Sequence, residues 1–161
     1  MGCVVSQQQY DKVMKYINLG NEQGAHLVTG GKRPEGEEFA KGFFVEPTIF
    51  DNVSYDMRIA QEEIFGPVLS VLTWDNEEEV IRQANSVNYG LTGAVWTKDI
   101  NRAFRVARAL DTGFVWINGS QQHFAGVPFG GHKNSGNTYE ESIDELLSFT
   151  QVKSINVMLS E

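Results

Sequence analysis

The stretch "GAVWTKDINRAFRVARALDTGFVWIN" (residues 93–118) decides the fold class. Two short apolar runs, rich in β-branched and aromatic residues, flank a segment whose apolar side chains recur at the spacing of an amphipathic helix. Asp99 stands where a helix N-cap is expected, and Gly113 stands where a helix ends. The apolar run at residues 67–74 and the helical pattern after it complete the order strand-helix-strand-helix-strand. This order predicts parallel strands joined by right-handed crossovers.

Each of the two helices predicted here has a capping residue and one apolar face. Asp75 is expected to cap the first helix, with Glu78 completing a capping box. The second helix is expected to bury Ile100, Ala103, Phe104, Ala107 and Leu110. Ligands of parallel sheets gather at the carboxyl ends of the strands. Residues 118–136 begin at such an end, so a binding site is expected there.

The flanking segments predict further helices and strands. A helix is expected between Ser6, a suitable N-cap, and Gly24. The runs "HLVT" and "FFVEPTIF" are typical of strands, and Pro47 in the second suggests an edge strand or a bend. Near the end, "YEESIDELLSF" predicts an amphipathic helix and "TQVKSINVML" a final strand. The side chains expected to face inward from the first and last helices are Tyr10, Val13, Met14, Ile17, Ile143, Leu146 and Leu147.

Composition and charge narrow the class of protein. The chain has 161 residues, of which 41% are hydrophobic and 21% are charged, as in a typical globular domain. The formal net charge of −8 disfavours nucleic-acid binding, which needs Lys and Arg against phosphates, and it also disfavours a polybasic membrane patch. No apolar run in the sequence approaches the roughly 20 residues of a membrane span. We therefore expect a cytoplasmic protein that binds neither nucleic acid nor a membrane.

The first six residues, "MGCVVS", allow more than one interpretation. They fit the N-myristoylation pattern, and Cys3 could take a second acyl chain. Cys3 is also the only cysteine, but no His, Lys or Arg precedes Lys12 to activate its thiol. An inert surface cysteine is the favoured interpretation. The histidines at 26, 123 and 132 lack the spacing of metal ligands, so no metal site is expected.

Two segments contain residues suited to binding a ligand. In "QEEIFGPVLSVL", the carboxylates of Glu62 and Glu63 precede Phe65. A carboxylate can accept two hydrogen bonds from a vicinal diol such as a ribose, and an aromatic ring can pack on a planar group. The residues alone favour a different arrangement, a helix end with solvated acids and a buried phenylalanine. In "FAGVPFGGHKNSG", glycines allow the backbone to approach a ligand closely, and Phe124 and Phe129 offer an apolar wall.

These motifs together resemble the aldehyde dehydrogenase superfamily. The resemblance is carried, in this order, by "QEEIFGPVLSVLTW", "ANSVNYGLTGAVWTKD", "GFVWIN" and "VPFGGHKNSG", and it extends to "AKGFFVEPTIF" and "TQVKSI". It covers the chain from Val4 to about Met158. It implies a three-layer αβα fold with a mostly parallel sheet, of the aldehyde dehydrogenase catalytic-domain type. Residues 1–149 would be the C-terminal portion of that domain, and residues 150–161 would be an oligomerisation strand and tail.

The resemblance also implies roles for single residues. Glu63 matches the family glutamate that holds the nicotinamide ribose hydroxyls, and Phe65 matches the phenylalanine that packs against the nicotinamide side of the cofactor. Asn118 begins the loop that lines the substrate tunnel, and Phe129 is the aromatic residue of its "PFGG" motif. The position of His123 often carries a tunnel-lining side chain in the family. In one departure, "SGNTYEES" lacks the arginine of the family's usual Gly-Arg-Glu run, which we expect to alter ion pairing near the tunnel mouth or a subunit contact.

The implied activity is the NAD(P)-dependent oxidation of an aldehyde to a carboxylic acid through a cysteine thioester. In full-length relatives the nucleophile, the base and the dinucleotide-binding domain lie upstream of the matching segment. Cys3 is then not catalytic, the "MGCVVS" pattern is coincidental, and the isolated chain is expected to be inactive and to bind neither NAD nor NADP. The expected partners are an aldehyde in the complete enzyme and further copies of the chain, through the C-terminal strand. The alternatives are a non-catalytic oligomerising or regulatory module and an acylated membrane module.

Overall fold

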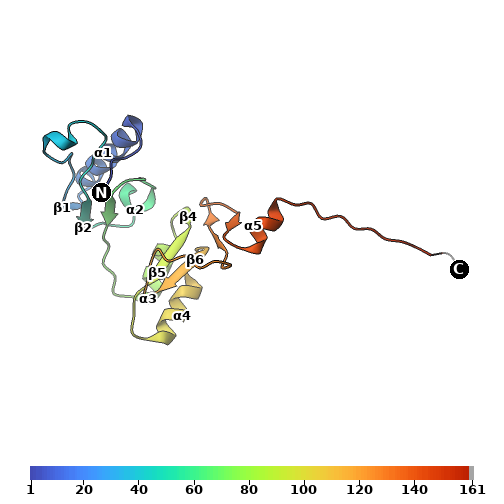
Figure 1. The fold of residues 1–161 in the computed structure, drawn as a ribbon. Helices are drawn as coiled ribbons and strands as arrows, with labels where there is room; N and C mark the ends of the chain where they lie inside the picture. Colours follow the sequence, from blue (N-terminus) through green and yellow to red (C-terminus); the bar gives the residue numbers. More distant parts are fainter. Residues whose placement is uncertain (160–161) are drawn as a thin grey trace. The chain divides into compact units, whose positions relative to one another are not determined.

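The computed structural model describes residues 1–159, which form two compact units (Figure 1). The first unit comprises Met1–Gln83, and the second begins at Ala84. Each unit combines helices with strands, as the alternation of helical and strand patterns in the sequence predicts.

The first unit has a mixed sheet of three strands in the order β1-β2-β3. Strand β2 pairs antiparallel with β1, with Phe50 opposite Leu27, and parallel with β3, with Thr48 opposite Val68. Its elements are α1 (Gln7–Glu22), β1 (His26–Thr29), the 3-10 helix η1 (Glu37–Phe39), β2 (Thr48–Asp51), α2 (Arg58–Gln61), β3 (Val68–Ser70) and α3 (Glu77–Ala84), whose last residue reaches the second unit.

Helix α1 forms where the sequence predicts it and supplies much of the core. The side chain of Ser6 accepts a hydrogen bond from the backbone N–H of Gln9 at 3.2 Å, and Gly24 follows the helix with φ of 90°. Val13 and Ile17 are fully buried and contribute to one apolar cluster with Phe50 of β2. This packing of one helix face onto the sheet excludes water from the interior of the unit.

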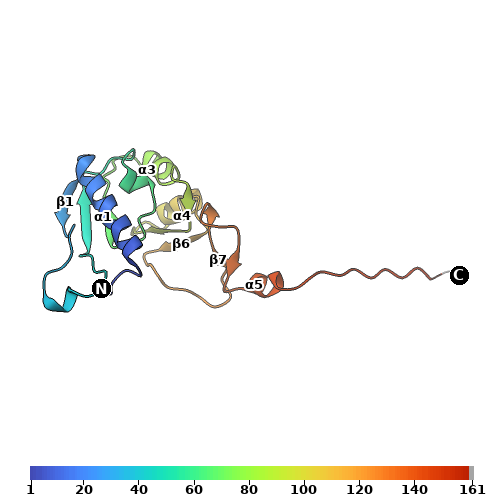
Figure 2. The ribbon, with the colours of Figure 1, turned by 90° about the horizontal axis from the view of Figure 1, so that it is seen from above.

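The second unit is built around the parallel pair β5–β6, with α4 packed against both strands (Figure 1). Two antiparallel pairs, β4–β8 and β7–β9, complete its pairing. Its elements are β4 (Tyr89–Gly90), β5 (Thr92–Val95), α4 (Ile100–Ala109), β6 (Phe114–Ile117), β7 (Phe129–Gly130), β8 (His132–Lys133), β9 (Tyr139–Glu140) and α5 (Ile143–Ser148). After α5 the chain runs without regular secondary structure from Gln151 to Leu159 (Figure 2).

Sequence and structure agree best at the β5-α4-β6 segment. Asp99 caps α4, since one carboxylate oxygen accepts hydrogen bonds from the N–H groups of Asn101 and Arg102 at 2.9 and 3.1 Å. The two strands are parallel, as predicted, with Thr92 opposite Phe114. The predicted buried face of the helix is only partly right, because Ala103 is buried whereas Ile100 and Phe104 are exposed.

Three expectations about the remaining elements are wrong. The strand at residues 68–70 pairs with β2 and not with β5, so residues 67–118 do not form one sheet of three parallel strands. The residue that caps α3 is Asn76, which accepts from the N–H of Glu79 at 3.0 Å, and not Asp75. The edge-strand alternative suggested by Pro47 is wrong, because β2 is the central strand of its sheet. This strand starts directly after Pro47, so the missing proline N–H removes no hydrogen bond from it.

The apolar end of the chain also differs from expectation. The α5 side chains predicted to face inward, Ile143, Leu146 and Leu147, are all exposed. Residues 151–159 form no strand, and positions 160 and 161 of the expected oligomerisation segment lie outside the described residues. A lone segment has no partner with which to form strand hydrogen bonds, so the oligomerisation strand stays a prediction.

Candidate functional site

The two adjacent carboxylates between α2 and β3 have different surroundings. Glu62 forms a two-point ion pair with Arg58, with N–O distances of 2.7 and 2.8 Å, and accepts the Tyr16 hydroxyl at 2.5 Å. The hydrogen bonds from Arg58 and then from Tyr16 lower the pKa of Glu62 to about 2. The same contact with Glu62 raises the pKa of the Tyr16 hydroxyl. The side chain of Glu62 therefore has a structural role, because its contacts link α2 to α1.

Glu63, in contrast, is available to a ligand. Its side chain is exposed and makes no hydrogen bond or ion pair with any residue that the structure describes. An ionised carboxylate offers up to four acceptor sites, so it can take both hydroxyls of a vicinal diol. Of the two carboxylates, Glu63 is the one suited to that task.

Phe65 is held in a conformation that turns its ring to solvent. Its φ is +57°, which is rare for an aromatic residue, and its side chain is 71% exposed. The amide of Gln9 donates hydrogen bonds to the carbonyl oxygens of Ile64 at 3.0 Å and of Phe65 at 2.8 Å. Backbone strain of this kind persists only where the surrounding contacts enforce it, and it gathers at binding sites. The expectation of a buried Phe65 at a simple helix end is wrong.

Close packing of the next residue fixes the path of this segment. A Cβ atom on Gly66 would lie 2.4 Å from Cγ2 of Val13, a fully buried side chain with a stiff χ1. Ile64, on the other side of Phe65, is buried as well. Closely packed residues therefore flank the exposed ring, which lies two positions after the free carboxylate of Glu63 in the sequence.

Two of the residues predicted to line a tunnel meet in the second unit. The rings of His123 and Phe129 lie 4.5 Å apart between centroids, and Phe114 lies 5.5 Å from Phe129. Trp116 joins them, 4.8 Å from Phe114, and its indole N–H donates to the carbonyl of Gln122 at 2.7 Å. We call these four rings the aromatic cluster. It provides an apolar surface beside the loop that follows β6.

Asn118, the third residue predicted to line the tunnel, makes a structural contact instead of joining the aromatic cluster. Its side-chain oxygen accepts from the N–H of Thr97 at 2.8 Å, and its amide donates to the carbonyl of Thr97 at 2.9 Å. It therefore acts as one more rung of the β5–β6 ladder, from a left-handed backbone with φ of +53°. A role in the tunnel stays a prediction for this residue.

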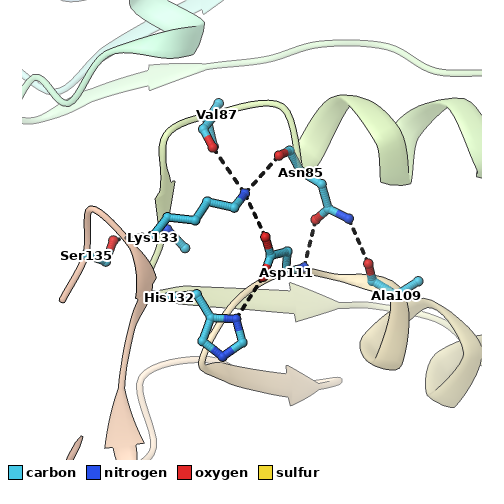
Figure 3. Close-up of polar contacts among 8 residues, drawn as sticks. Asn85, Val87, Ala109, Asp111, His132, Lys133 and Ser135 are labelled. Carbon is cyan, nitrogen blue, oxygen red and sulfur yellow. Dashed lines mark hydrogen bonds and ion pairs between the residues drawn. The ribbon is translucent and has the colours of Figure 1, made fainter. Parts of the chain in front are cut away.

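A polar network around Lys133 was not predicted from the sequence (Figure 3). The ammonium of Lys133 donates to the carbonyls of Asn85 and Val87 at 2.8 and 3.1 Å and pairs with Asp111 at 3.3 Å. The second oxygen of Asp111 lies 2.9 Å from Nδ1 of His132, and these contacts lower the pKa of Asp111. The network anchors the "PFGGHKNSG" segment, and it joins residues too far apart in the sequence for spacing to reveal it.

Cys3 and the three histidines do not gather into one group in the part of the chain that the structure describes. Cys3 is exposed, and the imidazoles of the three histidines instead contact Asp51, Glu141 and Asp111. Within this part of the chain no group of three or more His, Cys, Asp or Glu side chains could hold a metal ion. No helix in it has the length and apolar character needed to cross a bilayer.

Comparisons with known proteins agree on one family. The family model described as "Aldehyde dehydrogenase family" matches residues 1–155. The chain is 51% identical to aldehyde dehydrogenase tropH of Talaromyces stipitatus and 53% identical to the betaine aldehyde dehydrogenase of Bacillus subtilis, over 99% and 96% of its length. A solved structure of an AldA indole-3-acetaldehyde dehydrogenase mutant of P. syringae, in complex with NAD+ and IAA, matches 99% of the chain with a TM-score of 0.93 and 48% identity.

The matched region is a limited share of each of these proteins. The chain covers 32% of the Talaromyces protein, 31% of the Bacillus protein and 32% of the P. syringae chain. It thus spans about a third of the length of the relatives it matches.

Proposed function

Because the chain belongs to the aldehyde dehydrogenase family, we propose that it forms the C-terminal portion of the catalytic domain of an NAD(P)-dependent aldehyde dehydrogenase. The complete enzyme oxidises an aldehyde to a carboxylic acid through a cysteine thioester. Residues 1–149 belong to the three-layer catalytic domain in this proposal, and residues 150–161 form the oligomerisation strand. A cytoplasmic location is part of the same proposal.

The observation that carries the proposal is the state of Glu63 and Phe65. A carboxylate without a partner among the described residues and a ring forced into solvent are what a ribose and a planar nicotinamide require. In the complete enzyme Glu63 holds the ribose hydroxyls, and Phe65 packs against the nicotinamide side. NAD(P)+, when bound, supplies the acceptor for the hydride that leaves the aldehyde carbon. The residues of this chain orient that acceptor and perform no covalent step.

The aromatic cluster forms part of the substrate tunnel in this proposal. His123 and Phe129 supply a wall against which the carbon skeleton of an aldehyde can pack, and the network around Lys133 holds that wall in place. The nucleophile, the base and the dinucleotide-binding domain belong to the part of the enzyme that the matched third does not include. The sole cysteine, Cys3, is exposed and contacts none of the three imidazoles, so the chain alone turns over no aldehyde.

A chimera tests the proposal. The segment of the Bacillus subtilis betaine aldehyde dehydrogenase that matches this chain is replaced by residues 1–161, and NADH formation is followed. The chimera should oxidise aldehydes, whereas the isolated chain should not. In the chimera Glu63→Gln should raise the KM for NAD+ roughly 10- to 100-fold, since hydrogen bonds to a charged group contribute about 1.5–3 kcal/mol.

Glu38→Gln is the matched control, because Glu38 is also an exposed carboxylate of the first unit. It should leave the KM for NAD+ unchanged. Turnover by the isolated chain, or a chimera in which Glu63→Gln and Glu38→Gln bind NAD+ alike, would contradict the proposal.

A second candidate function is a non-catalytic module that associates through its end. The specific observation in its favour is the exposure of Val152, Ile155, Val157, Met158 and Leu159, each at least 75% accessible. Such a chain would dimerise or join complete subunits without taking part in chemistry. Isolated chains that form a stable oligomer, together with an inactive chimera, would favour this second function.

A further inference from the structure

Glu141 has an unusual set of contacts for a residue that the sequence did not single out. Its φ is +65°, a left-handed conformation that is costly for a residue with a side chain. Its backbone N–H donates to a side-chain oxygen of Glu145 at 2.7 Å, and its carbonyl accepts from the N–H of Gly126 at 2.9 Å. These contacts hold the Glu141 carboxylate next to the loop that carries His123.

The contact between Glu141 and His123 sets the position of a proton. Oε1 of Glu141 lies 2.7 Å from Nδ1 of His123. An ionised carboxylate can only accept hydrogen bonds, so Nδ1 must carry the hydrogen. In the neutral imidazole Nε2 then has a free lone pair. No residue that the structure describes makes a hydrogen bond with this second nitrogen.

The surroundings of the imidazole indicate what this lone pair can bind. His123 packs 4.5 Å from Phe129 and nearly parallel to Phe114, at 15° and 6.2 Å, so the neighbouring surface suits a flat apolar group. Glu141 and Glu145 give the same region negative charge, which disfavours an aldehyde that carries a carboxylate. A hydroxyl or N–H donor on an aromatic body satisfies both conditions.

Building on the proposed function, we propose that Glu141 is a positioning residue that selects the Nδ1–H tautomer of the neutral His123 imidazole. Nε2 then acts as a hydrogen-bond acceptor in the tunnel wall. The site selects aldehydes with an aromatic body that carries a hydroxyl or N–H donor. Glu141 stands in the "NTYEES" segment, eighteen residues after His123 in the sequence.

NMR spectroscopy of the isotopically labelled chain tests the proposal. At a pH of about 8.5, where imidazoles are generally neutral, long-range proton–nitrogen spectra report which ring nitrogen of His123 is protonated. The wild-type chain should show protonated Nδ1 and unprotonated Nε2. Glu141→Gln should give a mixture of both tautomers, since an amide can accept or donate. Glu140→Gln, a change at the adjacent exposed carboxylate, should leave the wild-type pattern.

Binding of two small probes provides the second measurement. Phenol should shift the Nε2 signal of His123 and bind about 2- to 10-fold more tightly than toluene, the range that one neutral hydrogen bond provides. His123→Phe should abolish the difference between the probes. The comparison of phenol with toluene is made on the wild-type chain, so it remains a test of the proposal even if a variant fails to fold.

Several results would overturn the proposal. They are an Nε2–H tautomer or an even mixture in the wild type, an unchanged tautomer in Glu141→Gln, and equal binding of phenol and toluene. A role of Glu141 in folding alone would lower stability without redistributing the tautomers. No cofactor takes part in these measurements, so their failure is distinct from an inactive chimera, which would contradict the proposed dehydrogenase function.

Discussion

At the scale of single residues, neighbours in the sequence can have opposite roles. Glu62 and Glu63 are chemically identical, yet the fold places Arg58 and Tyr16 around the first and leaves the second in solvent. Spacing indicates the pairing of Glu62 with Arg58, four residues earlier in the chain, but it does not reveal the second contact, with Tyr16 of a helix forty-six positions away. The resemblance to a known family selected Glu63, and the contacts give a physical reason for that choice.

The ion pair of Glu62 makes part of the chain's stability depend on pH. The pKa of Glu62 is lowered from 4.5 to about 2 in the folded state. A depressed pKa contributes stability that is fully present above 4.5 and is lost as the pH falls from about 4.5 through about 2. Arg58→Gln should move the titration of Glu62 towards its ordinary range and shrink this acid-dependent contribution.

Carbon-13 NMR of the Glu62 carboxyl across this pH range measures the titration directly. Arg82→Gln is a suitable control, because Arg82 is an exposed arginine that contacts Glu79, at 3.6 Å, and not Glu62. It should leave the Glu62 titration unchanged. A wild-type Glu62 that titrates at its ordinary value would show that the ion pair is not formed in solution.

Gln9 provides a second prediction at this scale. Its side-chain amide donates hydrogen bonds to the carbonyls of Ile64 and Phe65. Gln9→Ala should therefore lower the free energy of unfolding by about 1–3 kcal/mol. Gln8→Ala changes an exposed residue of the same helix turn and should have little effect. Urea denaturation of the two variants measures the difference. Equal stabilities would mean that Gln9 does not hold the segment that presents Phe65.

At the scale of elements, the end of the β5–β6 pair depends on one side chain. Asn118 reproduces a strand's hydrogen bonds to Thr97 at 2.8 and 2.9 Å. Asn118→Ala should expose the Thr97 N–H and destabilise the second unit by about 1–2 kcal/mol, because two bonds are lost and alanine tolerates the positive φ poorly. Asn118→Gly should lose the same two hydrogen bonds, but it should avoid the backbone cost, because glycine tolerates a positive φ.

Hydrogen exchange of the Thr97 amide separates the two effects. It should become faster in both variants, whereas the unfolding midpoint should be lower in Asn118→Ala than in Asn118→Gly. Unchanged protection of Thr97 would show that the contact is dispensable and would leave Asn118 available to a substrate.

The elements also show how far the sequence determines the fold. Local signals were sufficient for α1, for the Asp99 cap and for the parallel β5–β6 pair, because capping and periodicity act over a few residues. The partner of β3 was missed, since an apolar run does not specify which strand it pairs with. Phe104 and Ile100 were expected to be buried because periodicity marks an apolar face but not what covers it.

In the candidate sites, too, local sequence patterns indicate some features and only the structure shows the others. The "QEEIFGPV" motif singles out Phe65, but only the structure shows that its φ is +57° and that Gln9 donates a hydrogen bond to its carbonyl. These two features turn the ring outward. The pairing of His123 with Glu141 joins two loops, and no local pattern encodes such a contact. Long-range polar contacts are therefore the part of the site that sequence reasoning misses.

At the scale of the whole molecule, the C-terminal residues raise the question of association. Apolar side chains from Val152 to Leu159 are accessible, and the unpaired backbone of this segment can join a strand edge of another chain. In an extended conformation Ile155, Val157 and Leu159 share one face, because side chains alternate along a strand. That face is apolar enough to be stabilised by burial against a second copy.

We therefore predict that the chain forms a homo-oligomer that depends on residues 150–161. Size-exclusion chromatography with light scattering should show an oligomer for the full chain and a monomer after removal of these residues. Val157→Pro should also give a monomer, since proline removes an N–H donor and an apolar side chain from the middle of the segment. Asn156→Ser, a polar exchange at the adjacent position, should preserve the oligomer.

The salt dependence of association provides a further check. Because the net charge of −8 makes the copies repel one another, added salt should strengthen association. A monomeric full chain at high salt and high concentration would show that this segment does not act as an interface between copies of the chain.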